Sequence, residues 1–199
     1  MRSLRSIVSF IIGFSLLAAI SVSAVYADFN IGDRIYRNSG CSSGQEADPV
    51  NLLFWNQADT FNTLNNFQAH VGWGNDTGVT MWLKHHGSNC SAHTAQRASG
   101  GLYTNRDHIR FFNVNDNDPV YGTWTAAAIH FDQLCNWVHE GRSFNIERHN
   151  MLFFFSQGGH ATNESWQWVG GYWIWLPCAQ QWEWVDGILG KIEINHFHA

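Results

Sequence analysis

Four residues on two alternating apolar segments have side chains suited to anion binding and proton transfer. The segment RDHIRFF places His108 and Arg110 two positions apart, and YGTWTAAAIHFD places His130 and Asp132 at the same spacing. In an extended strand, residues two apart point to the same face. Guanidinium groups bind anions and imidazoles exchange protons near neutral pH, so the two segments predict a polar site with both abilities.

The surrounding segment Ala126–Asn150 is dense in ionisable groups, although only 14% of the chain is charged. Glu147 precedes Met151 by four positions and Phe154 by seven, so in a helix it shares their apolar face. A buried carboxylate needs a partner, which a neighbouring arginine or histidine would provide. We therefore expect one pocket built from His108, Arg110, His130, Asp132, His139, Glu147 and Arg148.

Three interpretations of this residue set remain open. If it is catalytic, hydrolysis of a phosphate or another ester fits best, with Arg110 and Arg148 holding the anion and a histidine base oriented by Asp132. If it is structural, the same groups form a buried network of hydrogen bonds and ion pairs. A divalent metal is the third option, with ligands from His108, His130 and either Asp132 or His139.

The two strand segments predict a hairpin, because the turn-rich sequence NVNDNDP separates them. A tight turn there would place His130 opposite about Tyr103, roughly 16 Å along the strand from His108. A bulge or a different pairing is therefore needed to bring the four polar residues together.

The remaining patterns predict an α+β fold with a mixed or antiparallel sheet. An apolar run at Val50–Asn56 is typical of a buried strand, and a helix capped by Asp59 should end at Gly72. The other expected elements are a strand at Val79–Leu83, a long surface loop at His85–Gly101, a helix or strand over Asn145–Gln157 and a last strand at KIEIN.

A tryptophan-rich β-hairpin is the clearest local prediction. SWQWV and YWIWL flank Gly170 and Gly171, which tolerate the positive φ of a two-residue turn. Each strand carries two tryptophans on one face, namely Trp166, Trp168, Trp173 and Trp175. They either fill core volume or, if exposed, form a surface for sugars or other ligands.

The amino terminus predicts export. Arg2 and Arg5 precede an apolar run and an A-x-A-like sequence, so residues 1–27 resemble a signal peptide that is cut after Ala27. The alternative is an uncleaved anchor that holds the chain at a membrane. We expect an irregular arm at 28–47 and one α+β domain at 48–199. In an exported chain four cysteines favour two disulfides; of the three possible pairings we favour Cys41–Cys90 with Cys135–Cys178.

Composition excludes nucleic acid as a partner. Without Arg2 and Arg5, nine Lys and Arg residues face 16 Asp and Glu residues, a formal charge of −7. Nucleic-acid phosphates are bound by clustered basic residues, which this chain lacks. The expected ligands are small molecules, envelope glycans or lipid-derived groups, and a purely structural envelope protein remains an alternative.

The chain resembles the LssY C-terminal domain family. The likeness spans Asp48 to Gly158 and rests on DPVNLLF, a helix ending in GW, RDHIRFF, YGTWTAAAIHFD, His139 and FNIERHNML, in that order. It implies an envelope location beside lipid-phosphatase-like proteins, with no defined activity for the domain. The matching site positions are His108, Arg110, Asp132, His139, Glu147 and Arg148. This chain departs from the pattern in Asn145, where an acid is common, in His130, and in its tryptophan-rich tail.

Overall fold

A computed structural model describes residues 34–36, 41, 48–55, 60–85, 89–118, 122–135 and 138–194. The predicted signal segment 1–27 and the proposed helix cap Asp59 lie outside these residues. The elements are β1 (Arg34–Tyr36), β2 (Leu52–Trp55), α2 (Thr60–Val71), β3 (Gly74–Asn75), β4 (Trp82–His85), β5 (Asn89–Ala92), β6 (Ala95–Ala98), β7 (Arg106–Asp118), β8 (Gly122–Cys135), β9 (Val138–Arg142), α3 (Phe144–Gln157), β10 (Ala161–Trp168), β11 (Tyr172–Leu176), β12 (Gln181–Val185) and β13 (Ile188–Ile194).

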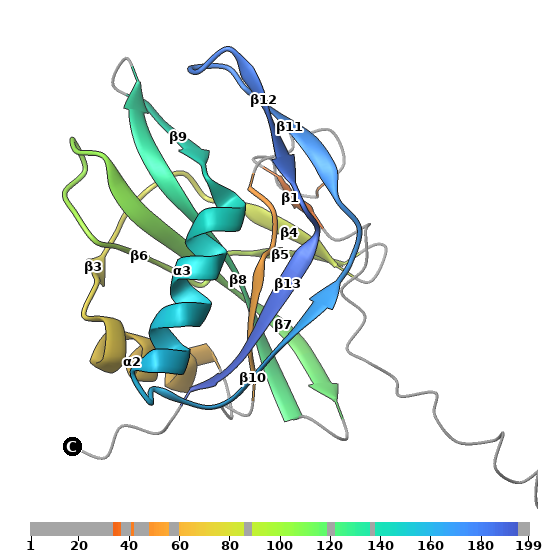
Figure 1. Cartoon of the computed structure of the whole chain (residues 1–199). Helices are drawn as coiled ribbons and strands as arrows, with labels where there is room; N and C mark the ends of the chain where they lie inside the picture. Colours follow the sequence, from red (N-terminus) through yellow and green to blue (C-terminus); the bar gives the residue numbers. More distant parts are fainter. Residues whose placement is uncertain are drawn as a thin grey trace, which may run out of the picture.

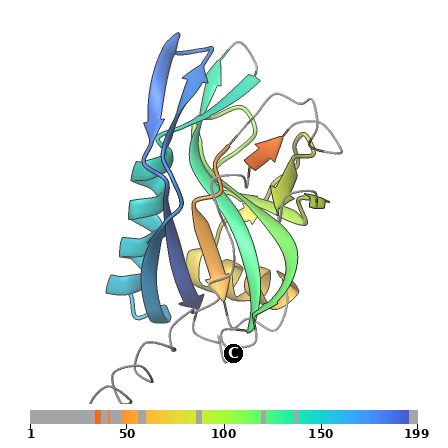
Figure 2. The same ribbon diagram turned by 90° about the vertical axis from the view of Figure 1, so that its right-hand side faces the viewer.

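The predicted α+β fold is confirmed. A large sheet has the strand order β10-β13-β2-β8-β7-β6-β3, with β9 also paired to β8. Its pairs are antiparallel except β13 with β2, which run parallel. A small sheet, β1-β4-β5, and the separate hairpin β11–β12 complete the architecture. Figures 1 and 2 show α3 on one side of the large sheet and the small sheet on the other.

Side-chain alternation along the strands divides the core into two layers. On β8, Ala127 and Ile129 face the helices, where they pack with Phe67 of α2 and Phe155 of α3. Ala126 and Ala128 face the other way and pack with Leu83 of β4 in the small sheet. The two-residue period of a strand thus gives each face its own apolar layer. The polar residues His108, Arg110, His130 and Asp132 lie on the sheet face that points away from the helices, next to this second layer.

Both predicted helices are present. Helix α2 ends where the sequence indicates, because Gly72 has φ +74° and donates its backbone N–H to Gln68 O at 2.9 Å. Helix α3 runs through the MLFFF segment, so the strand alternative for that segment is wrong. Within the described residues, neither helix is long and apolar enough to cross a bilayer.

Four sequence-based expectations need correction. The predicted loop at 85–101 contains β5 and β6, whose small and polar residues gave no strand signal. The arm at 28–47 contains β1, which pairs with β4. The strand expected at Val79–Leu83 begins only at Trp82. NVNDNDP belongs mostly to β7 instead of forming a tight turn.

The expected hairpin between SWQWV and YWIWL does not form. Strand β10 pairs with β13, and β11 pairs with β12, so Gly170 and Gly171 join two consecutive strands of one long ribbon (Figure 1). Gly170 has the positive φ expected of it, +101°, but the chain reverses later, between Leu176 and Gln181. Local sequence correctly indicated aromatic strands and a flexible link, whereas the choice of partner depended on β12 and β13.

The two favoured disulfides, Cys41–Cys90 and Cys135–Cys178, are confirmed. Their sequence separations are 49 and 43 residues, so each stabilises the fold by about 4 kcal/mol in the chain-entropy model. The first joins the amino-terminal segment to β5, and the second joins β8 to the β11–β12 turn. Their presence indicates an oxidising, extracytoplasmic compartment.

Candidate functional site

The register of the β7–β8 hairpin brings the predicted polar residues together. His108 lies opposite His130, and Arg106 lies opposite Asp132. Between the pairs Asn113–Thr125 and Asn117–Thr123, three residues of β7 face one residue of β8. This insertion shifts the register by two residues and preserves which face each side chain occupies. The tight-turn register that would pair His130 with Tyr103 is wrong, because β7 continues to Asp118, which pairs with Gly122.

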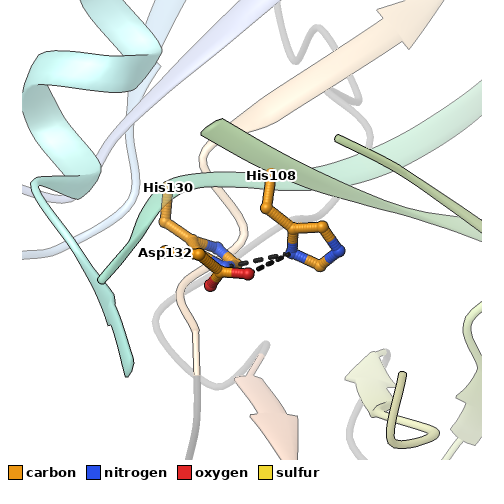
Figure 3. A group of neighbouring side chains, drawn as sticks. All are labelled: His108, His130 and Asp132. Carbon is orange, nitrogen blue, oxygen red and sulfur yellow. Dashed lines mark hydrogen bonds and ion pairs between the residues drawn. The ribbon is translucent and has the colours of Figure 1, made fainter. Parts of the chain in front are cut away.

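The carboxylate of Asp132 lies at the centre of this polar cluster. His130 Nε2 is 2.8 Å from Asp132 Oδ1, and His139 Nδ1 is 3.0 Å from Oδ2. His108 Nδ1 and Arg106 Nε lie 3.7 and 3.6 Å from Oδ2. Figure 3 shows the two buried imidazoles turned toward the carboxylate. Burial alone would raise the pKa of Asp132, but His130 and the other nearby histidines lower it below its ordinary value.

Two further carboxylates, Asp48 and Asp76, complete the cluster. Arg106 binds Asp76 in a bidentate pair, with N···O distances of 3.0 and 2.6 Å, and Arg110 pairs with Asp48. Sequence reasoning missed both acids, because Asp48 precedes a proline in a polar stretch and Asp76 follows a two-residue strand. Neither belongs to an alternating pattern, so only the tertiary fold reveals their roles.

Each added carboxylate faces the outer nitrogen of a buried histidine. His108 Nε2 lies 3.2 Å from Asp76 Oδ2, and His130 Nδ1 lies 3.8 Å from Asp48 Oδ2. Burial would raise the pKa of Asp76, but hydrogen bonds from His108 and Arg106 lower it to about 2. The two histidines therefore have their inner nitrogens near Asp132 and their outer nitrogens toward separate anions.

The cluster is almost sealed from solvent. His108 and His130 are fully buried, Asp132 is 3% exposed and Arg110 is 9% exposed. The side chain of His139, at 15%, is the most accessible of the group. Because Arg110 is already paired with Asp48, it is not free to hold a substrate anion as predicted. The arrangement suits proton exchange at His139 and metal ligation at the buried histidines.

The two helical members of the predicted set lie elsewhere. Glu147 faces a different cavity, of about 240 Å³, with Trp73, Asp107 and Phe154 among its lining residues. Burial, with the Asp107 charge adding to it, raises the pKa of Glu147, whose carboxylate accepts a hydrogen bond from Asn150. Among the described residues, Glu147 forms no ion pair with an arginine or histidine of the kind expected.

Arg148 is also separate from the polar cluster. Its guanidinium forms a bidentate pair with Asp186, at 2.6 and 2.9 Å, and donates to Ile188 O at 3.0 Å. Three residues earlier on α3, Asn145 accepts the backbone N–H of Asp186. These contacts fix helix α3 to the junction of β12 and β13, so Arg148 is engaged in the fold instead of being available to a ligand.

Six exposed tryptophans form a second candidate site. Trp173 lies opposite Trp184 and Trp175 opposite Trp182, with ring centroids 5.3 and 5.4 Å apart. The two pairs share one face of the β11–β12 hairpin, because their positions alternate with Ile174 and Glu183. These four rings, together with Trp166 and Trp168 of β10, are 44–70% exposed.

The opposite face of the hairpin packs into the protein. Leu176 and Val185 form a buried cluster with Phe144 at the start of α3. Glu183 accepts the backbone N–H groups of Ser143 and Phe144, at 2.9 and 3.0 Å, and thereby supplies the helix cap that Ser143 does not provide. The exposed tryptophans are therefore not required to fill this part of the core.

The β11–β12 turn has its own attachment to β9. Glu140, 8% exposed, accepts the backbone N–H groups of Cys178 and Ala179, at 2.6 and 3.2 Å. The disulfide from Cys178 to Cys135 lies beside these contacts. Both ends of the hairpin are consequently held, which presents the tryptophan face on a fixed support.

Comparison of the chain with protein-family models, curated proteins and solved structures finds no match.

Proposed function

We propose that this chain is an exported binding domain that uses its exposed tryptophans to bind a neutral glycan. The observation that carries the proposal is the exposure of six indole rings, four of them in two cross-strand pairs. Exposed aromatic surface of this extent is uncommon on monomeric proteins and marks interaction sites. Tryptophan combines a large apolar face with an N–H donor, which suits a ligand that has apolar faces and hydroxyl groups.

The charge of the surrounding strands favours a neutral ligand. Residues 161–185 contain no Lys, Arg or His and only two acidic residues, Glu164 and Glu183. Glu183 is already bound to the start of α3. A surface for phosphate or for an anionic lipid would require nearby cations. A sugar ring needs none, because stacking and hydrogen bonds to hydroxyl groups are sufficient.

Intrinsic fluorescence titration with soluble β-glucan, mannan, xylan and chitin oligosaccharides tests the proposal. Binding of one of these glycans should weaken about 10-fold or more in Trp182→Ala, as expected when a central aromatic contact is removed. Trp166→Ala tests the same surface without removing a hairpin pair. Phe153→Ala is the matched control, because this exposed aromatic residue lies on α3, outside the tryptophan strands.

Three results would contradict glycan binding. The first is an unchanged fluorescence spectrum across the whole panel. The second is binding to zwitterionic lipid vesicles that Trp182→Ala abolishes, which would assign the surface to a membrane. The third is a concentration-dependent dimer in sedimentation experiments that the same variant dissociates, which would assign the tryptophans to self-association.

Hydrolysis of a phosphate or another ester at the polar cluster is the second candidate function. The favouring observation is His139, which is the most accessible histidine of the cluster and is oriented by Asp132 at 3.0 Å. Generic phosphoesters assayed with wild type, His139→Ala and Asp132→Ala, with and without chelator, test it. Equal background rates in all three proteins would remove this candidate. The likeness to the LssY C-terminal domain family and export through residues 1–27 stay predictions.

A further inference from the structure

Three donor atoms from neighbouring strands converge on one point inside the polar cluster. They are His108 Nδ1, His130 Nε2 and a carboxylate oxygen of Asp132, all within 4.8 Å of one another. The two nitrogens are 3.2 Å apart; His130 Nε2 is 2.8 Å from Asp132 Oδ1, and His108 Nδ1 is 3.7 Å from the other oxygen, Oδ2. Ligand atoms 2.0–2.1 Å from a tetrahedral zinc ion are separated by roughly 3.3 Å. We propose that His108, His130 and Asp132 bind one divalent transition-metal ion, with zinc as the best match.

An outer carboxylate directs the lone pair of His108 inward, and a second carboxylate lies on the outer side of His130. Asp76 lies 3.2 Å from His108 Nε2, so a proton on that nitrogen leaves the Nδ1 lone pair facing the centre. Asp48 Oδ2 lies on the outer side of His130, but at 3.8 Å from Nδ1 it is beyond hydrogen-bond distance. Without metal, His130 Nε2 donates to Asp132; with metal, that proton lies on Nδ1. A carboxylate behind a ligating imidazole is the usual outer partner at metal sites, where it fixes the tautomer and the ring orientation.

The charges of the cluster also favour a cation. Asp76 is neutralised by Arg106 and Asp48 by Arg110, so the pairs account for two of the three carboxylates. Asp132 has no such close arginine, since Arg106 Nε is 3.6 Å away. Counted without the histidines, the three carboxylates and two arginines carry one net negative charge, which a bound cation offsets.

The ligand types indicate which metals fit. Two imidazoles and one carboxylate suit zinc, cobalt, nickel or copper, whereas calcium and magnesium prefer all-oxygen sites. His139 holds the second oxygen of Asp132 from the solvent side. The metal site shares no residue with the tryptophan surface, so the inference goes beyond glycan binding and does not depend on it.

The purified chain, with intact disulfides and freed of metal by a chelator, is titrated with Zn²⁺ and Co²⁺. A Zn²⁺ concentration 100-fold above Kd should raise the Tm by roughly 5–10 °C. Co²⁺ should give the intense visible absorption of a four-coordinate site. His108→Ala and Asp132→Asn should each bind one ion fewer and lose both signals. His149→Ala, an exposed histidine on α3, should match wild type and controls for loose binding to surface histidines.

A measurement on wild type alone keeps the inference testable if the ligand variants fail to fold. In ¹⁵N-histidine spectra, Zn²⁺ should shift the His108 Nδ1 and His130 Nε2 resonances before those of exposed histidines. Unchanged ring resonances for these two residues would overturn the proposal. So would a wild type without a Tm rise, or equal metal stoichiometry in wild type, folded His108→Ala and folded Asp132→Asn.

Discussion

Substitution of Arg148 tests whether helix α3 and the β12–β13 junction are joined by an ion pair. Arg148→Met keeps most of the side-chain volume and removes the bidentate contact with Asp186 and the hydrogen bond to Ile188 O. The arginine side chain is 8% exposed and that of Asp186 is 27% exposed. Breaking a fully buried pair costs about 3–5 kcal/mol, but water can reach Asp186, so we expect about 2–3 kcal/mol.

Urea unfolding followed by far-UV circular dichroism, with the disulfides intact, measures this loss. The corresponding fall in Tm is roughly 4–12 °C for a domain of this size. Asp186→Asn should also destabilise the protein, and the double variant should lose less than the sum of the two single losses, because the residues are in direct contact. His149→Ala, the exposed neighbour on α3, should stay within about 0.5 kcal/mol of wild type.

The pKa of Asp186 determines how the stability difference between wild type and Asp186→Asn changes with pH. Burial would raise the pKa of Asp186, but the Arg148 guanidinium and the Ile188 N–H lower it overall. A lowered folded-state pKa contributes stability above the unfolded value, near 3.9, and this contribution is lost as the pH falls through the folded value. The gap between wild type and Asp186→Asn should therefore be full at pH 7 and shrink below about pH 4. Equal stability of Arg148→Met and wild type at pH 7 would refute the ion-pair reasoning and return Arg148 to the candidates for ligand binding.

Three other substitutions test neighbouring contacts. Gly141→Ala should cost about 1–3 kcal/mol in urea unfolding, because the added Cβ would lie 2.8 Å from His130 Cδ2; no loss would mean that the ring can move aside. Glu183→Ala should cost roughly 0.5–2 kcal/mol through loss of the α3 cap, and an unchanged Tm would contradict that role. Glu147→Gln should stabilise the protein at pH 7, since the raised pKa of this carboxyl means that its charged form is disfavoured by folding. That benefit should disappear below the unfolded pKa, near 4.3, and a variant less stable than wild type at pH 7 would contradict the sign.

Local patterns predicted the elements of the fold better than their partners. Helical spacing and a glycine stop were sufficient for α2, because both signals lie within the helix itself. Alternation likewise identified β7 and β8 as strands. The tryptophan strands were recognised for the same reason, but Gly170 and Gly171 looked like a hairpin turn. Strand partners are decided by long-range packing. The residues around the two glycines do not indicate that β10 pairs with β13 and β11 with β12.

The candidate site shows the same division between local and long-range information. Spacing two residues apart predicted that His108 and Arg110 share a face, and that His130 and Asp132 do. The distance between these pairs depended on where the hairpin reverses, after Asp118, which the sequence placed several residues too early. Asp48 was missed because an acid in a loop has no periodic signature, although its contacts are as close as those of the strand residues.

The density of ionisable groups in Ala126–Asn150 arises because side chains of β8, β9 and α3 contact different parts of the protein. Neighbouring residues on β9 point to opposite sides, so His139 contacts Asp132 in the polar cluster while Glu140 binds the turn of the tryptophan hairpin. Further along, α3 directs Arg148 to the base of that hairpin. One short segment therefore supports both candidate sites. A change in the strand position of β9 would displace both, whereas substitution of a single side chain on β9 should affect only the site that it faces.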